Sequence, residues 1–316
     1  MSEVDEEREG GVRVVVAALA VNVAIAVCKF IAAALSRSTA MLAEALHSLA
    51  DSANQVFLLL GLKFSSRPAD EEHPFGYGLE TYFWSFIVAL CIFSVGGAFS
   101  MYEGMHKLLH GEEAKLGNPL SAYIVLGLSI LLESYSCRVA LKEFRHLQRG
   151  RPLRQTLVEA RDPTVLTVLF EDVAALFGLA VALVGVVLAE LTHHAEWDGA
   201  ASVLVGVALI VVAIFLARDS RRLLIGRSMP KSERDKIFAI ASQARDVLKV
   251  IHIRTVHLGP REVMAGLKLS FTPTLEVKTL EIRINELEAA LRAALPELVR
   301  IYIEPGFDER KTASKA

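Results

Sequence analysis

A stripe of polar residues in an otherwise apolar segment is the first feature of this sequence that could do chemistry. Spacings of three, four and three residues separate Glu44, His47, Asp51 and Asn54 in the segment MLAEALHSLADSANQVFLLLGLKF. At about 100° per residue, these positions fall on one face of a helix. An imidazole and a carboxylate one helical turn apart can both reach a single metal ion. His47 and Asp51 therefore predict half of a metal site.

Two adjacent carboxylates in another apolar segment could supply the remaining ligands. Glu171 and Asp172 occur together in the run VLTVLFEDVAALFGL. Neighbouring residues of a helix point about 100° apart, so both side chains reach one ion only if the helix bends or rotates. The alternative for either residue is a structural bond to a buried partner such as Asn22 or Lys29. We expect Asp172 to be a ligand, and both roles stay open for Glu171.

Helices that cross a membrane must carry these polar residues. The 316-residue chain is 53% hydrophobic, and a helix needs ~20 mostly apolar residues to span a bilayer. Six candidate spans cover residues 12–35, 39–64, 80–101, 120–141, 165–191 and 199–217. Ionisable groups in hydrocarbon are costly unless they are paired or bind an ion. Four aligned polar groups favour a bound cation over simple hydrogen bonds between helices.

The regions outside the spans predict the orientation of the chain. Arg and Lys are concentrated between residues 138 and 161 and between residues 218 and 231, while the connection before the sixth span has neither. Because basic loops stay in the cytoplasm, we expect both termini to be cytoplasmic. The leader is short and acidic, without the pattern of a cleaved signal or transit peptide. These features favour a multi-pass protein of a cell membrane, namely a bacterial inner membrane.

The last part of the chain has the composition of a small soluble domain. Helical periodicity marks residues 232–244 and 275–295, and strand patterns mark residues 249–258, 263–271 and 299–303. The order αββαβ predicts a small α+β, ferredoxin-like domain. We therefore expect an all-α transmembrane domain of six helices over 1–226, a cytoplasmic αββαβ domain over 227–306 and a disordered tail over 307–316.

Other classes of function have weaker support in the residues. A net charge of -2 without an arginine-rich stretch argues against nucleic-acid binding. The chain lacks an HExxH motif, so an intramembrane metalloprotease is disfavoured, and we expect no enzyme activity. A channel needs equivalent oxygens along an open path, whereas these ligands are clustered. The three cysteines, Cys28, Cys91 and Cys137, predict neither a disulfide nor a thiolate site.

The motifs resemble those of the cation diffusion facilitators, dimeric membrane proteins that exchange Zn²⁺ or similar ions for protons. The resemblance covers nearly the whole chain. It rests on HSLAD at 47–51, which has the family's HxxxD form, on the connection RPADEEHPFGYGLE, on Asp172 and on the αββαβ region. The Glu-Asp pair in the fifth span resembles the Glu-Asp pair that stands in this region in the branch that includes zinc transporter 9.

This resemblance implies transport-site roles for individual residues. His47 and Asp51 take the roles of the second helix, and Asp172 takes that of the fifth. The family's fourth ligand is usually a histidine four residues before that aspartate, where this chain has Val168. Glu171 then becomes the substitute ligand, directly or through water. The resemblance also implies a homodimer formed through the C-terminal domain.

Two further metal sites of the family are incomplete in this sequence. Asp70 and His73 match a site in the second connection, but Tyr77 stands where that site has another histidine. We expect a weak cation site there, with a solvated acidic loop as the alternative. The C-terminal domain contains only two histidines, His252 and His257. We expect it to dimerise without a binuclear metal site.

The sequence therefore predicts a secondary active transporter that exports a divalent cation from the cytoplasm in exchange for protons. Imidazole with carboxylates favours Zn²⁺, while additional oxygen ligands shift the preference toward Mn²⁺, Fe²⁺ or Co²⁺. An exporter of one of these ions is the alternative, and a metal-gated channel is a weaker one. His47 and one of the acids are the expected proton carriers. The expected partners are the metal ion, membrane lipid and a second copy of the chain, with no tightly bound cofactor.

Overall fold

The computed structural model describes residues 3–36, 39–110, 119–148, 152, 162–192 and 196–306. Internal contacts divide the chain into two compact units. The helical unit comprises Met1–Ser66 and Glu80–Arg221, and the C-terminal unit comprises Arg67–Leu79 and Arg222–Ala316. The connection 67–79 therefore groups with the C-terminal unit, although it joins two helices of the helical unit. The predicted tail over 307–316 lies outside the described residues.

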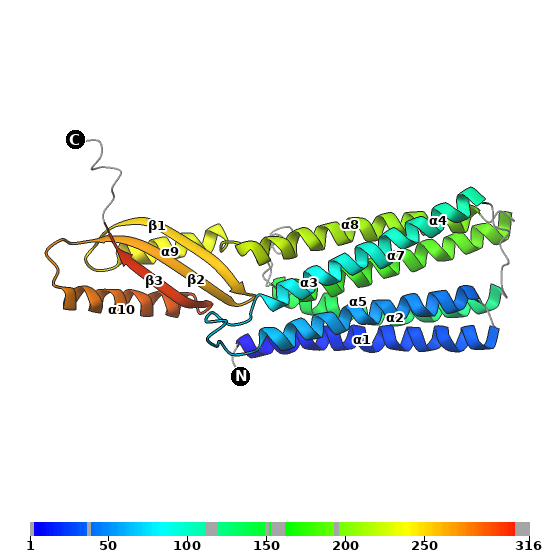
Figure 1. The fold of residues 1–316 in the computed structure, drawn as a ribbon, viewed down its shortest axis with the longest axis horizontal. Coiled ribbons are helices and arrows are strands. Elements are labelled where there is room, and N and C mark those ends of the chain that lie inside the picture. Colours follow the sequence, from blue (N-terminus) through cyan, green and yellow to red (C-terminus); the bar gives the residue numbers. More distant parts are fainter. Residues whose placement is uncertain are drawn as a thin grey trace. The chain divides into compact units, whose positions relative to one another are not determined.

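Long helices in the first unit follow the apolar runs of the sequence (Figure 1). They are α1 (Glu3–Ser36), α2 (Thr39–Ser65), α3 (Glu80–Cys91), the π-helical turn η1 (Ile92–Ala98), α4 (Phe99–His110), α5 (Pro119–Gln148), α7 (Pro163–Thr192) and α8 (Glu196–Gly226). Within the described residues, five helical stretches are long and apolar enough to cross a membrane. They lie in α1, in the continuous run from α3 to α4, and in α5, α7 and α8. The predicted helical membrane domain is confirmed, and α2 is not among these five stretches.

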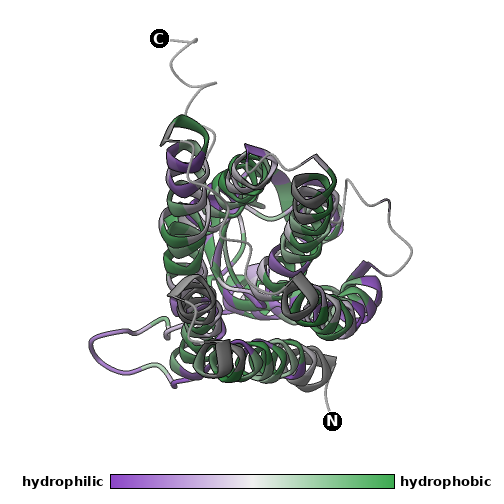
Figure 2. Ribbon diagram, turned by 90° about the vertical axis from the view of Figure 1, so that its right-hand side faces the viewer, coloured by the Kyte–Doolittle hydropathy of each residue, from purple (hydrophilic) through white to green (hydrophobic). Residues whose placement is uncertain are grey.

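The helical unit is apolar on its outside and partly polar in its interior. Large apolar side chains are exposed on several helices, including Val16, Val27, Ile31, Leu131, Val184 and Val211. Buried polar residues include Asn22, Asn54, Gln55, Ser136, Thr167 and Asp172. Figure 2 shows hydrophobic residues, in green, along the helices of this unit. Lipid in contact with the outside explains this distribution, because polar residues of membrane helices face the interior.

The polar residues lie where four helices of this unit meet. α1 packs against α2 and α5, and α5 packs against α7. One apolar core joins these helices and includes Val15, Leu58, Ala140 and Val168. This core holds the helices at fixed positions, so the polar side chains beside it face one another across helix boundaries.

Glycines allow α8 to approach the run from η1 to α4 closely. A Cβ atom added at Gly206 would lie 2.7 Å from the backbone nitrogen of Met101 and 2.8 Å from the carbonyl oxygen of Gly97. Real Cβ atoms do not approach backbone atoms so closely, so only glycine fits at this position. Small residues that let backbones approach are a common means of packing membrane helices.

We expect Gly206→Leu to push α8 away from η1 and α4. Overpacking of this kind costs ~1–3 kcal/mol, so the unfolding temperature of the detergent-purified protein should fall. Gly127→Leu is the matched control, because a Cβ atom added at Gly127 of α5 would have no neighbouring atom within 4 Å. Equal unfolding temperatures for the two variants would contradict the close helix approach.

The C-terminal unit contains the elements α9 (Lys231–Gln243), β1 (Val247–Gly259), β2 (Glu262–Phe271), α10 (Val277–Ala294) and β3 (Leu298–Pro305). The predicted order αββαβ is thus confirmed. β2 is the central strand, antiparallel to β1 and parallel to β3. Alternate residues of β2, such as Leu267 and Leu269, form a buried core with Ile237 of α9 and Leu291 of α10. Both helices therefore cover the same face of the sheet.

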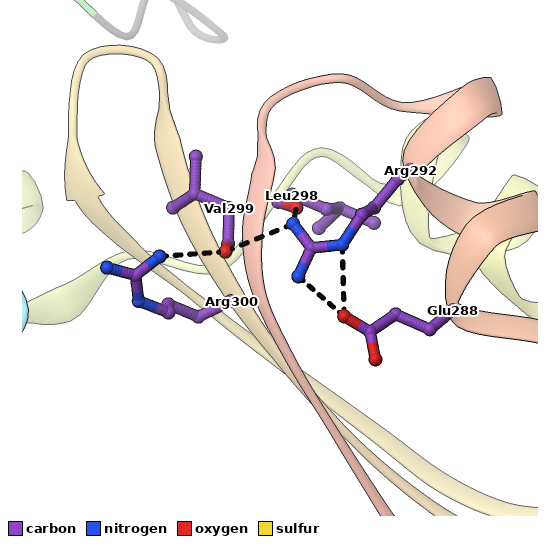
Figure 3. Close-up of polar contacts among 5 residues, drawn as sticks. All are labelled: Glu288, Arg292, Leu298, Val299 and Arg300. Atoms are coloured by element: carbon purple, nitrogen blue, oxygen red, sulfur yellow. Dashed lines mark hydrogen bonds and ion pairs between the residues drawn. The ribbon is translucent and has the colours of Figure 1, made fainter. Parts of the chain in front are cut away.

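Arg292 fixes the end of α10 to the start of β3 (Figure 3). Its Nη1 donates to the carbonyl oxygens of Leu298 and Val299 at 3.1 and 3.2 Å. Its Nε and Nη2 donate to Glu288 Oε1 at 3.0 and 2.6 Å. The carbonyl oxygen of Val299 also accepts a bond from Arg300 at 3.1 Å. These bonds hold the short connection that brings β3 back parallel to β2.

The connection 67–79 joins the C-terminal unit through Gly78. A Cβ atom added at Gly78 would lie 2.5 Å from the carbonyl oxygen of Leu258 and 2.9 Å from Cα of Gly259. This close backbone approach places the connection against the end of β1 and explains its grouping with the C-terminal unit.

Candidate metal centre

The polar stripe of the sequence lies on α2, and its described members point into the helical unit. Asp51 is half-buried, and Asn54 is buried. Gln55, beside the stripe, is fully buried. His47 lies on the same helix one turn before Asp51. The side chains of His47 and Glu44 lie outside the described part of the structure.

Glu171 of α7 is held by two amide side chains of α2. Asn54 Nδ2 donates to Oε1 at 2.9 Å, and Gln55 Nε2 donates to Oε2 at 2.8 Å. Asn22 of α1 donates from Nδ2 to Gln55 Oε1 at 3.1 Å. Because the oxygen of Gln55 is occupied by Asn22, its amino group must face Glu171. A structural bond to a partner such as Asn22 was the alternative role for Glu171, and the structure places Gln55 between Asn22 and Glu171.

Asp172 faces a different helix from its neighbour. Its side chain is 2% exposed, and Ser136 Oγ of α5 donates to Oδ2 at 2.8 Å. Glu171 thus faces α2 while Asp172 faces α5, as expected for adjacent residues of a helix. The two carboxylates therefore join α7 to two separate neighbours.

Glu133 of α5 is a buried carboxylate that the sequence analysis missed. Its side chain is 8% exposed, and the negative charges of Asp172 and Asp51 act on it. A signal was present, because Ser129, Glu133 and Ser136 follow spacings of four and three residues and are all buried. This second polar stripe on α5 is analogous to the one on α2.

The candidate centre gathers negative charge from three helices. The charges of Asp51, Glu133 and Asp172 all act on Glu171. Val168, one turn before Asp172, is fully buried in the apolar core and offers no ligand atom. Among the side chains that the structure describes, no three from His, Cys, Asp or Glu lie close enough to hold a metal ion. The arrangement favours a cation in the interior, and His47 stays a predicted member of its ligand set.

Asp70 organises the connection 67–79 through hydrogen bonds. Tyr77 Oη donates to Asp70 Oδ2 at 2.7 Å, and the backbone N–H of His73 donates to Oδ1 at 2.7 Å. The rings of His73 and Tyr77 lie 4.2 Å apart between centroids. Both oxygens of Asp70 therefore already accept a hydrogen bond within the loop. A weak cation site at Asp70 and His73 stays a prediction.

The hydrogen bonds of this loop predict a change in acidity. The bond from Tyr77, followed by that from His73, holds the pKa of Asp70 below its usual value. A carboxyl group with a lowered pKa favours the folded loop above its unfolded pKa, and that contribution is lost as the pH falls through the folded pKa. We expect Tyr77→Phe to raise the pKa of Asp70 toward its ordinary value, measured by a titration of the carboxyl ¹³C shift. The exposed Asp235 is the control, and an unchanged Asp70 titration would contradict the bond.

A row of polar side chains crosses the sheet of the C-terminal unit. His252 of β1 pairs with Lys268 of β2, which pairs with Glu304 of β3. Lys268 Nζ lies 2.9 Å from Glu304 Oε1, and this contact lowers the pKa of Glu304. His257, the other histidine of this unit, is buried. Lys268 therefore already neutralises the charge of Glu304.

Comparison with known proteins gives a consistent family match. Residues 15–225 match the cation efflux transmembrane domain. The chain is 33% identical over 245 residues to metal tolerance protein C4 of Arabidopsis thaliana, which covers 77% of this chain and 53% of that protein. It is 31% identical over 287 residues to the mitochondrial proton-coupled zinc antiporter SLC30A9 of Xenopus laevis, which covers 88% of this chain and 51% of that protein.

A third relative is matched over most of its length. The magnetosome protein MamM of Paramagnetospirillum magneticum is 23% identical over 307 residues, covering 94% of this chain and 88% of that protein. By contrast, the chain spans about half the length of the first two relatives. Residues 15–225, which match the cation efflux transmembrane domain, include the polar stripes of α2 and α5 and the carboxylates of α7.

Proposed function

This chain belongs to the cation efflux family, the cation diffusion facilitators, and on that premise we propose that it exports a divalent metal cation from the cytoplasm in exchange for protons. It is related to the zinc transporter 9-like proteins, and Zn²⁺ is the first candidate for the cargo. The names of two relatives, a proton-coupled zinc antiporter and a metal tolerance protein, support this proposal.

The observation that carries the proposal is a cluster of acidic side chains inside an apolar helical unit. Asp51 of α2 and Asp172 of α7 act electrostatically on both Glu133 of α5 and Glu171 of α7. Isolated carboxylates in hydrocarbon cost several kcal/mol. A divalent cation offsets that cost while it is bound, and protons offset it after the cation leaves. Binding and release of the two species are thereby coupled.

We assign the cargo ion to His47, Asp51 and Asp172, with Glu171 contributing directly or through water. Imidazole with carboxylates favours Zn²⁺ among divalent ions, and a higher share of oxygen ligands favours Mn²⁺, Fe²⁺ or Co²⁺. Metal ligation requires neutral imidazole and ionised carboxylates, so protons and the metal ion compete for the same atoms. His47 has the side-chain type that changes its protonation near neutral pH.

We also infer the placement of the chain in its membrane. α2 would be the sixth span, since it lies between two membrane-length helices and packs against α1 along its length. The basic residues that follow α5 and end α8 support our proposal that both termini are cytoplasmic and that the membrane is a bacterial inner membrane. The C-terminal unit, which we class as ferredoxin-like with boundaries at 227 and 306, would join two copies as a homodimer.

Metal-resolved transport in proteoliposomes tests the proposal. Purified protein is reconstituted with a pH gradient, and the uptake of Zn²⁺, Mn²⁺, Fe²⁺ and Co²⁺ is measured separately. We expect saturable uptake with Zn²⁺ as the best cargo and a rate that falls when the pH gradient is removed. Uptake that does not saturate would indicate a channel, and no uptake of any of these ions would contradict the proposal.

A further inference from the structure

Glu133 is the buried acid for which the proposed transport site has no role. It lies on α5 with Ser129 and Ser136, and the side chain of Ser136 donates to Asp172. The stripe therefore faces α7 at the level of the proposed ligand Asp172. The charges acting on Glu133 come from Asp172, Asp51 and, with opposite sign, Lys29 of α1.

Glu133 differs from the two acids of α7 in its contacts with the described residues. It is 8% exposed, and among the described residues it forms no hydrogen bond and no ion pair. A buried carboxylate without a partner is costly unless an ion or proton reaches it. Asp172, by comparison, accepts a bond from Ser136, and Glu171 accepts one bond at each oxygen. Glu133 is therefore a buried acid of this cluster whose oxygens accept no hydrogen bond from the described residues.

The proposed site also lacks one metal ligand. Val168 is apolar and fully buried, so α7 supplies no ligand one turn before Asp172. Bonds from Asn54 and Gln55 already orient both oxygens of Glu171 and hold α7 to α2. A further carboxylate from a third helix would supply the missing ligand while these bonds stay in place.

We propose that Glu133 of α5 is a ligand of the transported divalent cation, together with His47, Asp51 and Asp172, and that it takes the ligand role otherwise left to Glu171, which positions α7 against α2. This inference rests on the proposed transport function. Among the described residues, no group of three His, Cys, Asp or Glu side chains could hold a metal ion as it stands. Binding of the cation draws Glu133 and Asp172 together. One imidazole with three carboxylates leaves the loaded site with a net negative charge.

Metal binding by Glu133→Gln tests this assignment. The full chain is purified in detergent, and the Kd for Zn²⁺ is measured by isothermal titration calorimetry. The amide keeps the size of the side chain but is a poor ligand, so we expect the Kd to rise about 100-fold or more. Glu143→Gln is the matched control, because Glu143 lies on the same helix outside the cluster. We expect the control to leave the Kd unchanged.

A spectroscopic readout separates a ligand from a structural residue. Co²⁺ bound to the native chain should show the intense visible absorption of a four-coordinate ion, and Glu133→Gln should weaken it as water replaces the carboxylate. If Glu133→Gln does not fold, Glu133→Asp keeps the charge and shortens the reach, and it should raise the Kd and alter the Co²⁺ spectrum. An unchanged Kd and spectrum in a folded Glu133 variant would overturn the proposal.

The outcomes distinguish failure of this inference from failure of the proposed function. If His47→Ala and Asp51→Asn lose Zn²⁺ while Glu133→Gln binds it normally, only the role of Glu133 is wrong. If all of these variants bind Zn²⁺ normally, the proposed transport site itself is wrong. Glu133→Gln could also lower the unfolding temperature. If the double variant Lys29→Met/Glu133→Gln restores it, with a normal Kd for Zn²⁺, then Glu133 only balances the charge of Lys29.

Discussion

Asp51→Asn is expected to reduce Zn²⁺ uptake into proteoliposomes to the level of protein-free vesicles. The substitution removes one negative charge and one ligand oxygen from the buried cluster while keeping the size of the side chain. His47→Ala should have the same effect, because it removes the only imidazole that the sequence places on this face of α2. Loss of a residue that only supports a metal ligand commonly lowers metal affinity or activity by about 10–100-fold. Loss of the ligand itself costs more, so we expect a fall in uptake of at least about 100-fold.

Asp235→Asn provides the matched control for this loss. Asp235 is an exposed aspartate of α9 in the C-terminal unit, and the same chemical change there should leave uptake unaltered. Equal elution of all variants in size-exclusion chromatography establishes that they are folded. Native uptake in folded Asp51→Asn or His47→Ala would contradict the assignment of these residues to the transport site.

The adjacent acids of α7 are expected to respond differently to substitution. Asp172→Asn keeps an oxygen for the bond from Ser136, so the fold should persist while the Kd for Zn²⁺ rises about 100-fold or more. Glu171→Leu leaves the buried amino groups of Asn54 and Gln55 without an acceptor. Each unsatisfied group costs ~1–3 kcal/mol. We therefore expect a marked fall in unfolding temperature for Glu171→Leu.

A double-mutant cycle between Asn54 and Glu171 measures the structural part of this difference. Asn54→Leu removes one donor, so the combined variant should lose less stability than the sum of the two single variants. Gln55 is a poorer choice, because it also accepts the bond from Asn22. A Glu171→Leu variant with native unfolding temperature but no Zn²⁺ binding would instead make Glu171 a ligand.

Local periodicity predicted the elements of the fold because each is encoded in its own segment. The apolar runs gave the membrane helices, and alternation of apolar residues gave β1 and β2. The helices end at different residues from the predicted spans, since polar residues extend them beyond the apolar run. The predicted span 80–101, for example, continues through η1 and α4 to His110.

The contacts between helices were only partly predictable. The stripe on α2 and the acids of α7 stood out, because ionisable residues are rare in apolar segments. Gln55 and Ser136 did not stand out, because the role of an amide or a hydroxyl in a span depends on the helix that it faces. Glu133 was detectable by its spacing from Ser129 and Ser136, but no single-helix pattern says that this face meets Asp172.

Simultaneous recording of Zn²⁺ and proton movement by the native chain tests the central claim most directly. Proteoliposomes containing a Zn²⁺-sensitive dye and a pH-sensitive dye are given external Zn²⁺ without an imposed pH gradient. The buried carboxylates and His47 cannot hold the metal ion and their protons together. Zn²⁺ entry should therefore make the vesicle interior more alkaline at a constant ratio of protons to metal. Zn²⁺ entry with no opposite proton movement would contradict exchange at this site.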